Sequence, residues 1–145
     1  MSIELYFEVP GDPVAQPRHR VRRVGKRSML YLPSKHPVHG YKAAIRAAFV
    51  AVAGKWKTIA GPVQLSVYCR FEMPKSWSKK KRSESQGILH GSKPDADNVL
   101  KAVEDALTDC GVWNDDAQVA SAFISKRWSE TPQTEIWIRE CDPGE

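Results

Sequence analysis

The chain has 145 residues, which fits one domain with its own hydrophobic core, and it carries a formal net charge of +5. No apolar run approaches the roughly 18 residues that span a membrane, and the N-terminus lacks the pattern of a signal peptide, so we expect a cytoplasmic protein without a membrane partner. The three cysteines are far apart and the four histidines form no zinc signature, which argues against a disulfide framework or a zinc-ligand motif.

The N-terminal part of the chain combines a strand with a basic segment. Alternation predicts a strand over residues 3–9, and three prolines then break regular structure. Residues 18–27 read RHRVRRVGKR and hold six of the 22 lysines and arginines. A return strand over 29–32 would make this run a hairpin arm with one basic face, a common phosphate-binding surface, whereas the plainer alternative is a solvated charged loop. The candidate contacts are Arg18, Arg20, Arg22, Arg23, Lys26 and Arg27.

The middle of the chain reads as a helix followed by a central strand. Helical spacing over 38–53 places Val38, Tyr41, Ile45, Ala48, Phe49 and Val52 on one side, and Gly54 ends the helix. Strict alternation over 62–72 then predicts a half-buried strand in the centre of a sheet.

Residues 73–94 show no periodic pattern and are too long for an ordinary connection, so we expect a functional or disordered, flexible basic loop. Its segment KSWSKKKR adds five basic residues and one tryptophan. Such a loop would attract a polyanion, and Trp77 would stack on exposed bases; packing of Trp77 against the body is the equally weighted alternative. The candidate contacts here are Lys75, Trp77, Lys79, Lys80, Lys81 and Arg82.

Residues 93–119 read KPDADNVLKAVEDALTDCGVWNDDAQV and hold seven of the 17 acidic residues of this basic protein. Pro94 and the cap residue Asp95 predict a helix that starts near residue 96, with a buried stripe of Leu100, Val103, Leu107 and Cys110, and Gly111 ends it. Asp97 and Lys101 are then neighbours one turn apart. Two further strands are expected over 119–128 and 135–140.

Each aspartate in this segment has an ordinary explanation as a helix cap, a first-turn acid or a turn former. These explanations do not account for the concentration of aspartates in one segment, because crowded carboxylates repel one another unless a cation neutralises them. Three or four aspartates with few histidines or cysteines nearby form a hard, oxygen-rich site suited to magnesium or manganese.

These elements predict a single α+β domain over residues 1–145, with two main helices on a mixed or antiparallel sheet of about four to five strands. No glycine-rich phosphate loop appears, so function has to be argued from the acidic site rather than from the fold.

The run KPDADNVLKAVEDAL, followed by GVWNDDAQV, closely resembles the RusA family of Holliday junction resolvases of bacteria and their phages. The resemblance implies that Asp95, Asp97 and Asp116 are metal-binding carboxylates, that Lys101 is a catalytic lysine, and that Asp115 is a secondary metal position. It also implies a homodimer. The strong match covers about 27 residues, and a weaker likeness extends to the segment FEVPGDPVAQPRHR.

We therefore expect a Mg²⁺-dependent endonuclease, with Mn²⁺ as a substitute and no small-molecule cofactor, that resolves four-way DNA junctions by paired cleavage in recombination and repair. Two alternatives remain from the residues alone. A general metal-dependent nuclease would use the same aspartates without regard to branching, and a non-catalytic DNA-binding module would use only the basic segments.

Overall fold

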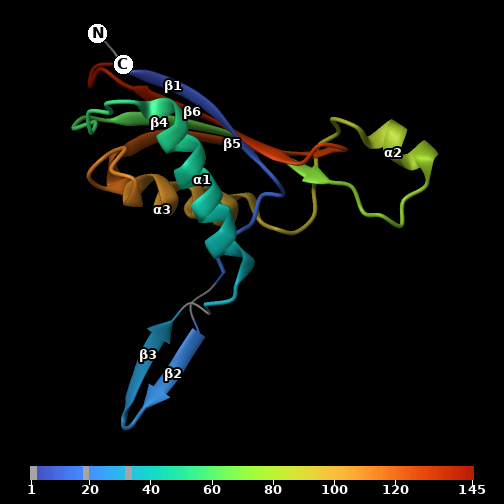
Figure 1. Ribbon diagram of the computed structural model, residues 1–145, viewed down its shortest axis with the longest axis horizontal. Helices are drawn as coiled ribbons and strands as arrows, with labels where there is room; N and C mark the ends of the chain where they lie inside the picture. The colour runs from blue at the N-terminus through green and yellow to red at the C-terminus, as the bar shows by residue number, and fades with distance from the viewer. Residues whose placement is uncertain (1–2, 18–19, 32–33) are drawn as a thin grey trace.

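The computed structural model describes residues 3–17, 20–31 and 34–145, and within 20–24 and 27–31 it describes the backbone alone. Four strands form one mixed sheet in the order β1-β6-β4-β5, and Figure 1 shows helices α1 and α3 together on one side of it. The strands are β1 (Glu4–Pro10), β4 (Val63–Glu72), β5 (Val119–Ser129) and β6 (Gln133–Glu140). Pairing is parallel only between β4 and β5. The α+β prediction is confirmed.

Strand β4 lies inside the sheet because it is apolar at every second position. Its residues Val63, Leu65, Val67, Cys69 and Phe71 are buried toward the helices, as predicted. Ile136 and Ile138 of β6 and Phe7 and Val9 of β1 continue the same inner face. The core therefore fills the space between one face of the sheet and the two helices.

Helix α1 (Pro37–Ala53) begins where the His36 side chain accepts a hydrogen bond from the Val38 amide, and it ends before Gly54, which has a φ of 58°. Four of the six predicted inward residues are buried, but the expectation for Val52 is wrong, since 49% of it is exposed. Val52 lies in the last turn of α1, where Ala53 packs against the core instead.

The buried stripe of helix α3 (Ala96–Asp109) contains two of the four predicted residues, Val103 and Leu107. Val99, Ala102, Val103, Ala106 and Leu107 are buried, whereas Leu100 and Cys110 are only half-buried. The small alanines carry the close contact with the sheet and α1, and a pattern search that weights large residues misses them. Gly111 follows the helix with a φ of 74°, as expected for a residue that ends a helix.

Two elements extend away from this body in Figure 1. Strands β2 (Arg20–Val24) and β3 (Arg27–Tyr31) pair as the predicted hairpin arm. The second element is the seven-residue helix α2 (Lys79–Ser85), in a segment where the sequence showed no regular structure. Ser78 caps α2 by accepting a hydrogen bond from the Lys81 amide, and Leu89 forms a bridge with Arg127 of β5, so this loop is more regular than its sequence pattern indicates.

Among the described residues, no helix is long and apolar enough to cross a membrane.

Candidate active site

The acidic segment begins at the N-terminus of α3, where Asp95 occupies the cap position. Among the described residues its side chain makes no capping hydrogen bond. Instead, both carboxylate oxygens accept from the Lys93 ammonium group, at 3.0 and 3.2 Å. Asp95 is half exposed, so its carboxylate is accessible to solvent and is neutralised by a single surface lysine.

Six residues beyond Asp95, Lys101 of α3 binds two acidic side chains, those of Asp105 and Asp116. Its Nζ donates to Asp116 Oδ2 at 3.0 Å and lies 3.1 Å from Asp105 Oδ1. Asp116 starts the short 3-10 helix η1 (Asp116–Gln118), so this contact joins α3 to the start of η1.

The bonds that Lys101 makes to Asp116 and then to Asp105 raise its pKa, and the bond from Lys101 lowers the pKa of Asp116. Each shift favours the charged form of its group, so both groups remain charged at neutral pH.

Asp97 lies between Asp95 and Lys101 in the sequence, and its carboxylate is in a different environment. It is exposed in the first turn of α3, and within the described part of the chain it makes no hydrogen bond or ion pair. Lys101 is one turn away but pairs with Asp105 and Asp116 instead. Asp97 therefore presents a carboxylate that no other described group uses.

Asp115, by contrast, has a complete structural role. Its Oδ1 accepts from the Ala117 amide at 2.8 Å, while Gln118 Oε1 accepts from the Asp115 amide at 3.0 Å, and together these form a capping box at η1. The side-chain amide of Gln118 donates through Nε2 to the carbonyl oxygens of Ile59 and Gly61, and these bonds connect η1 to the body. The capping explanation thus accounts for Asp115.

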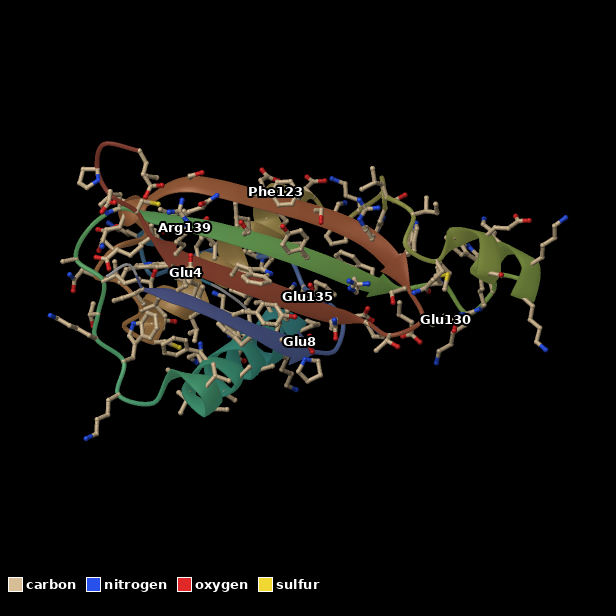
Figure 2. All side chains as sticks on the ribbon, turned by 90° about the horizontal axis from the view of Figure 1, so that it is seen from above. Glu4, Glu8, Phe123, Glu130, Glu135 and Arg139 are labelled. Carbon is tan, nitrogen blue, oxygen red and sulfur yellow. The ribbon has the colours of Figure 1, made fainter. Side chains whose placement is uncertain are left out.

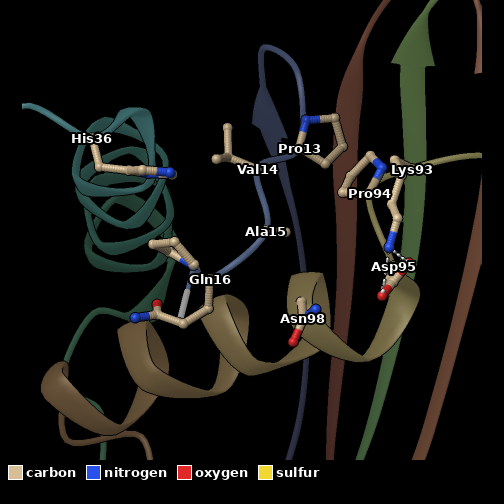
Figure 3. Close-up of a pocket in the computed structure, with 10 residues that line it drawn as sticks. Pro13, Val14, Ala15, Gln16, His36, Lys93, Pro94, Asp95 and Asn98 are labelled. Atoms are coloured by element: carbon tan, nitrogen blue, oxygen red, sulfur yellow. Dashed lines mark hydrogen bonds and ion pairs between the residues drawn. The ribbon is translucent and has the colours of Figure 1, made fainter. Parts of the chain in front are cut away.

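The predicted carboxylates line two hollows rather than one. Asp95 and Lys93 border an open cleft of about 520 Å³, shown in Figure 3, together with His36 and residues 13–17. Asp116 borders a second hollow of about 390 Å³ on the other part of α3, with Lys42 and Asp105. Asp97 lines neither of these two.

The donor chemistry of Asp95, Asp97 and Asp116 fits a hard divalent cation, because all three offer carboxylate oxygens and two of them already bind a lysine ammonium group. They are not gathered around one point: among the described residues, no three His, Cys, Asp or Glu side chains come together in a metal-binding group. Binding of a metal to all three would therefore require these side chains to leave the arrangement that the two lysines hold.

Sequence reasoning missed Lys126, which positions the loop that carries Asp95. Its Nζ donates to the carbonyl oxygens of Ser92 and Pro94, both at 2.6 Å. Lys126 lies on β5 between Ile124 and Trp128, two residues that pack against the core. A lysine at a core-facing position of an alternating strand was the available signal, because a cation there needs acceptors.

His90 holds the same loop from its other side. The ring is buried, stacks on Trp128 at 3.8 Å between centroids, and accepts a hydrogen bond at Nδ1 from the Ser92 amide. Burial, and then the charge of Lys126, lower the pKa of His90. The ring therefore stays neutral at neutral pH, which leaves Nδ1 free to accept.

The basic segment over residues 75–82, which precedes this loop, also packs on Trp128. The Trp77 ring lies 5.0 Å from Trp128, with the Lys81 ammonium group 4.2 Å over its face, so the structure favours the packing interpretation of Trp77. Arg82 donates to the carbonyl oxygens of Pro74 and Trp77 and so shapes the loop. Three predicted contacts of this segment are exposed, without a hydrogen bond or ion pair to any described group: Lys75, Lys79 and Lys80.

The hairpin arm carries the other predicted basic contacts. Arg20, Arg22 and Arg23 lie on β2 and Arg27 begins β3, while Lys26 is exposed at the turn. Arg18 lies outside the described residues.

With this geometry in place, comparison with known proteins is informative. A family model described as "Endodeoxyribonuclease RusA" matches residues 10–139, which include both acidic helix starts and both basic segments. The chain is also 40% identical over 143 residues to a Bacillus subtilis (strain 168) protein named "Uncharacterized protein YqaN", and the match covers 94% of this chain and 96% of that protein.

Proposed function

Because this chain belongs to the RusA family of endodeoxyribonucleases, we propose that it resolves four-way DNA junctions by paired, magnesium-dependent cleavage of phosphodiester bonds. The observation that carries the proposal is the arrangement at α3, where Lys101 joins Asp116 and Asp105 and, one turn away, the carboxylate of Asp97 has no partner among the described residues. A cation and a carboxylate without a described partner, one helical turn apart, suit the cleavage of a phosphodiester, which needs both positive charge and metal ligands.

In this proposal Lys101 acts by its charge. Its raised pKa makes it a poor general base, since the ammonium form persists well above neutral pH. Held at the exposed surface of α3, the ammonium group would stabilise negative charge that develops on the phosphate or on the leaving oxygen. Asp105 and Asp116 hold it in the metal-free arrangement, and Asp105 would keep it in place when Asp116 turns to the metal ion.

Asp95, Asp97 and Asp116 would hold the metal ion, with Asp115 kept as the cap of η1. Magnesium, or manganese in its place, would supply a Lewis acid for the scissile phosphate and a more acidic water. Lys93 would give up Asp95 on metal binding, which a surface ion pair of two exposed side chains permits at small cost.

The basic elements would bind the phosphate backbone on either side of this site. Lys75, Lys79 and Lys80 project from the segment that leads into the Asp95 loop, and the β2–β3 arm extends from the body near the cleft of Figure 3, which residues 13–17 and His36 border. Sequence-independent phosphate contacts of this kind set affinity rather than chemistry.

A junction presents two equivalent strands to be cut, so the simplest matching assembly is a symmetric homodimer with one active site in each copy. Branched DNA and a second copy of the chain are thus the two partners that we propose, with the cytoplasm of a bacterial cell as the location.

The proposal is tested by incubating the protein with a synthetic mobile four-way junction and with linear duplex of the same sequence, each with magnesium and with chelator. We expect paired nicks in the junction, little cleavage of the duplex, and no cleavage in chelator. Equal cleavage of both substrates would identify a general metal-dependent nuclease. Tight binding without any cleavage would identify a DNA-binding module.

A further inference from the structure

The cleft beside Asp95 has room for more than a metal ion. It measures about 520 Å³, and pockets of this size hold organic groups rather than a single ion. Figure 3 shows that its walls come from separate parts of the chain: the loop over residues 13–17, His36 before α1, the neighbours Lys93 and Pro94, and Asn98 in the first turn of α3. The cleft therefore lies where this loop, α1 and α3 meet, next to the acidic site.

The walls of the cleft suit a flat, uncharged ring. Three proline rings and a valine provide apolar surface: Pro13, Pro17, Pro94 and Val14. Neutral polar groups come from the side chains of Gln16, Asn98 and His36. His36 Nδ1 accepts the hydrogen bond from the Val38 amide, so in the neutral ring the proton is on Nε2 and can be donated. A nucleobase combines apolar faces with a hydrogen-bonding edge, and both are matched by these walls.

The loop that carries Gln16 is fixed to the helix that carries the acidic site. The backbone amide of Gln16 donates to the carbonyl oxygen of Asn98 at 2.8 Å, which binds the loop to the first turn of α3. Val14, two residues earlier, packs against the hydrophobic core. A group held by Gln16 would therefore have a fixed position relative to Asp95 and Asp97.

The side chain of Gln16 has an unsatisfied polar atom. Its Oε1 is buried, yet it accepts no hydrogen bond from any residue that the structure describes. A buried amide oxygen without a donor destabilises the folded state, and such atoms are rare in proteins. Rotation of the terminal amide would bring its oxygen, an acceptor, or its nitrogen, a donor, to the cleft that Gln16 lines. A ligand with a donor and an acceptor on one edge would satisfy both.

The cleft also lies on the path that bound DNA would take. Strand β2 begins shortly after Pro17, and β3 ends shortly before His36, so the basic arm connects to the chain at two residues that line the cleft. Asp95 lines the same cleft. A DNA strand whose phosphates run from the arm to the acidic site would therefore pass the mouth of the cleft.

Exposed aromatic rings lie on the outer face of the sheet, away from α1 and α3, and they are a poorer site for a base. Four of them are between 37% and 50% exposed: Tyr6, Tyr68, Phe123 and Trp137. Figure 2 looks onto this face and labels four glutamates on it or at its edges: Glu4, Glu8, Glu130 and Glu135. Glu4 and Glu8 are exposed on β1, so phosphates are repelled from this side of the sheet.

We propose that the cleft receives one unpaired nucleobase of the bound junction and that Gln16 binds the hydrogen-bonding edge of this base, an inference that rests on the proposed junction-resolving function. Taking a base out of the stack costs least where its pairing is already weakened, as at a branch point. The proline rings pack on the faces of the base, and the amide gives its edge a donor and an acceptor. Gln16 then determines which base is accepted next to the scissile phosphate.

The first test measures discrimination between bases. Junctions that differ only in the base pairs at the branch point are cleaved by the wild type, Gln16→Met and the control Gln133→Met. Methionine keeps an unbranched side chain and removes both hydrogen-bonding atoms, and Gln133 lies outside the cleft, where it binds Glu135. We expect the wild type and the control to favour one base by about tenfold in rate, and Gln16→Met to cut with little preference. A wild type without preference, or the same preference in Gln16→Met, would overturn the role of Gln16.

A second test follows the base itself and does not require cleavage. 2-Aminopurine, whose fluorescence rises when it leaves the stack, is placed in turn at each position around the branch point, and protein is added in chelator. We expect one position to brighten severalfold with the wild type and much less with Gln16→Met. No response at any position, or equal responses to the two proteins, would overturn the proposal.

Stability in urea distinguishes this role of Gln16 from a structural one. Because Oε1 has no partner among the described residues, Gln16→Met should unfold at the same urea concentration as the wild type or at a higher one. A clearly lower midpoint would show that the amide supports the fold, and it would overturn the assignment of Gln16 to ligand binding.

The two assays on DNA also separate this proposal from the proposed function. A base that brightens with the wild type and not with Gln16→Met supports the cleft even if no junction is cut, in which case the proposed function fails alone. Junctions that are cut in pairs, with no base responding at any position, would overturn the cleft proposal and leave the proposed function intact.

Discussion

Two helix starts in this molecule carry the same signal, an aspartate at the cap and a second aspartate within the first turn, yet they use it differently. At η1 the cap is complete: Asp115 binds the Ala117 amide, and Gln118 binds back to Asp115. At α3 the cap residue Asp95 makes no capping bond among the described residues and binds Lys93 instead. The capping explanation therefore accounts for one acidic pair and leaves the other without a structural role.

The difference distinguishes carboxylates that stabilise the fold from carboxylates that are available to a ligand. A residue that contributes to folding has its polar atoms satisfied by nearby backbone, as Asp115 does. Asp97 and Asp95 instead face solvent. Within the described ranges of the chain Asp97 has no partner, and Asp95 is paired with a lysine that is itself almost fully exposed. Unpaired or weakly paired carboxylates at the positive end of a helix are available to a ligand.

The largest effect that follows from this contrast is on cleavage. We expect Asp97→Asn and Asp116→Asn each to lower the rate of junction cleavage by about a hundredfold or more, since metal-ion stabilisation is worth several kcal/mol and about 1.4 kcal/mol is a factor of ten. Junction affinity in a gel-shift assay should stay the same or rise, because a negative charge facing phosphate is removed.

Asp115→Asn is the matched control, because asparagine caps helices about as well as aspartate and removes the same charge next to Asp116. It should retain cleavage. Near-normal turnover by Asp97→Asn or Asp116→Asn would show that this carboxylate is not part of the reaction.

A smaller effect is expected from a change at Lys126, the residue that holds the loop carrying Asp95. Lys126→Met removes the donor to Ser92 and Pro94 while keeping an unbranched side chain between the core neighbours. We expect the magnesium concentration for half-maximal cleavage to rise by about tenfold, as for residues that orient metal ligands. A variant with a lower rate but an unchanged magnesium requirement would assign Lys126 to general stability instead.

The smallest effect concerns folding alone. Asp115→Ala should lower the free energy of unfolding by about 1 kcal/mol, because it removes a formed cap, whereas Asp95→Ala should change it by much less. Urea denaturation of the two variants and the wild type measures both values. An Asp95→Ala variant as destabilised as Asp115→Ala would mean that the two aspartates stabilise their helices equally.

The sequence predicted much of the fold because alternation and helical spacing are strong in β4, α1 and α3. Strand β4 is a clear case: its alternating apolar positions are the ones that are buried. Helix α2 was missed because its residues are charged or small on all sides, so no apolar stripe marks it. Its stability comes from contacts made elsewhere in the chain, such as the packing of Trp77 on Trp128.

For the site, the sequence predicted which residue types gather near α3 but not how each is held. Asp115 and Asp116 are adjacent and chemically identical, and only the fold assigns one to a backbone cap and the other to Lys101. Lys126 lies 31 residues from Asp95 in the sequence and binds its loop from strand β5, a contact that no local pattern encodes.

The claim that Asp95, Asp97 and Asp116 serve a metal ion rather than helix capping is tested most directly by thermal melts of the wild type, Asp97→Asn and Asp115→Asn. Each protein is melted in chelator and across a magnesium titration at fixed ionic strength. The wild type and Asp115→Asn should gain melting temperature with magnesium, because a ligand that binds the folded state stabilises it. In Asp97→Asn this gain should shrink or vanish, with stability in chelator unchanged or higher. A wild type indifferent to magnesium and manganese, together with an Asp97→Asn variant that is less stable in chelator, would contradict the account.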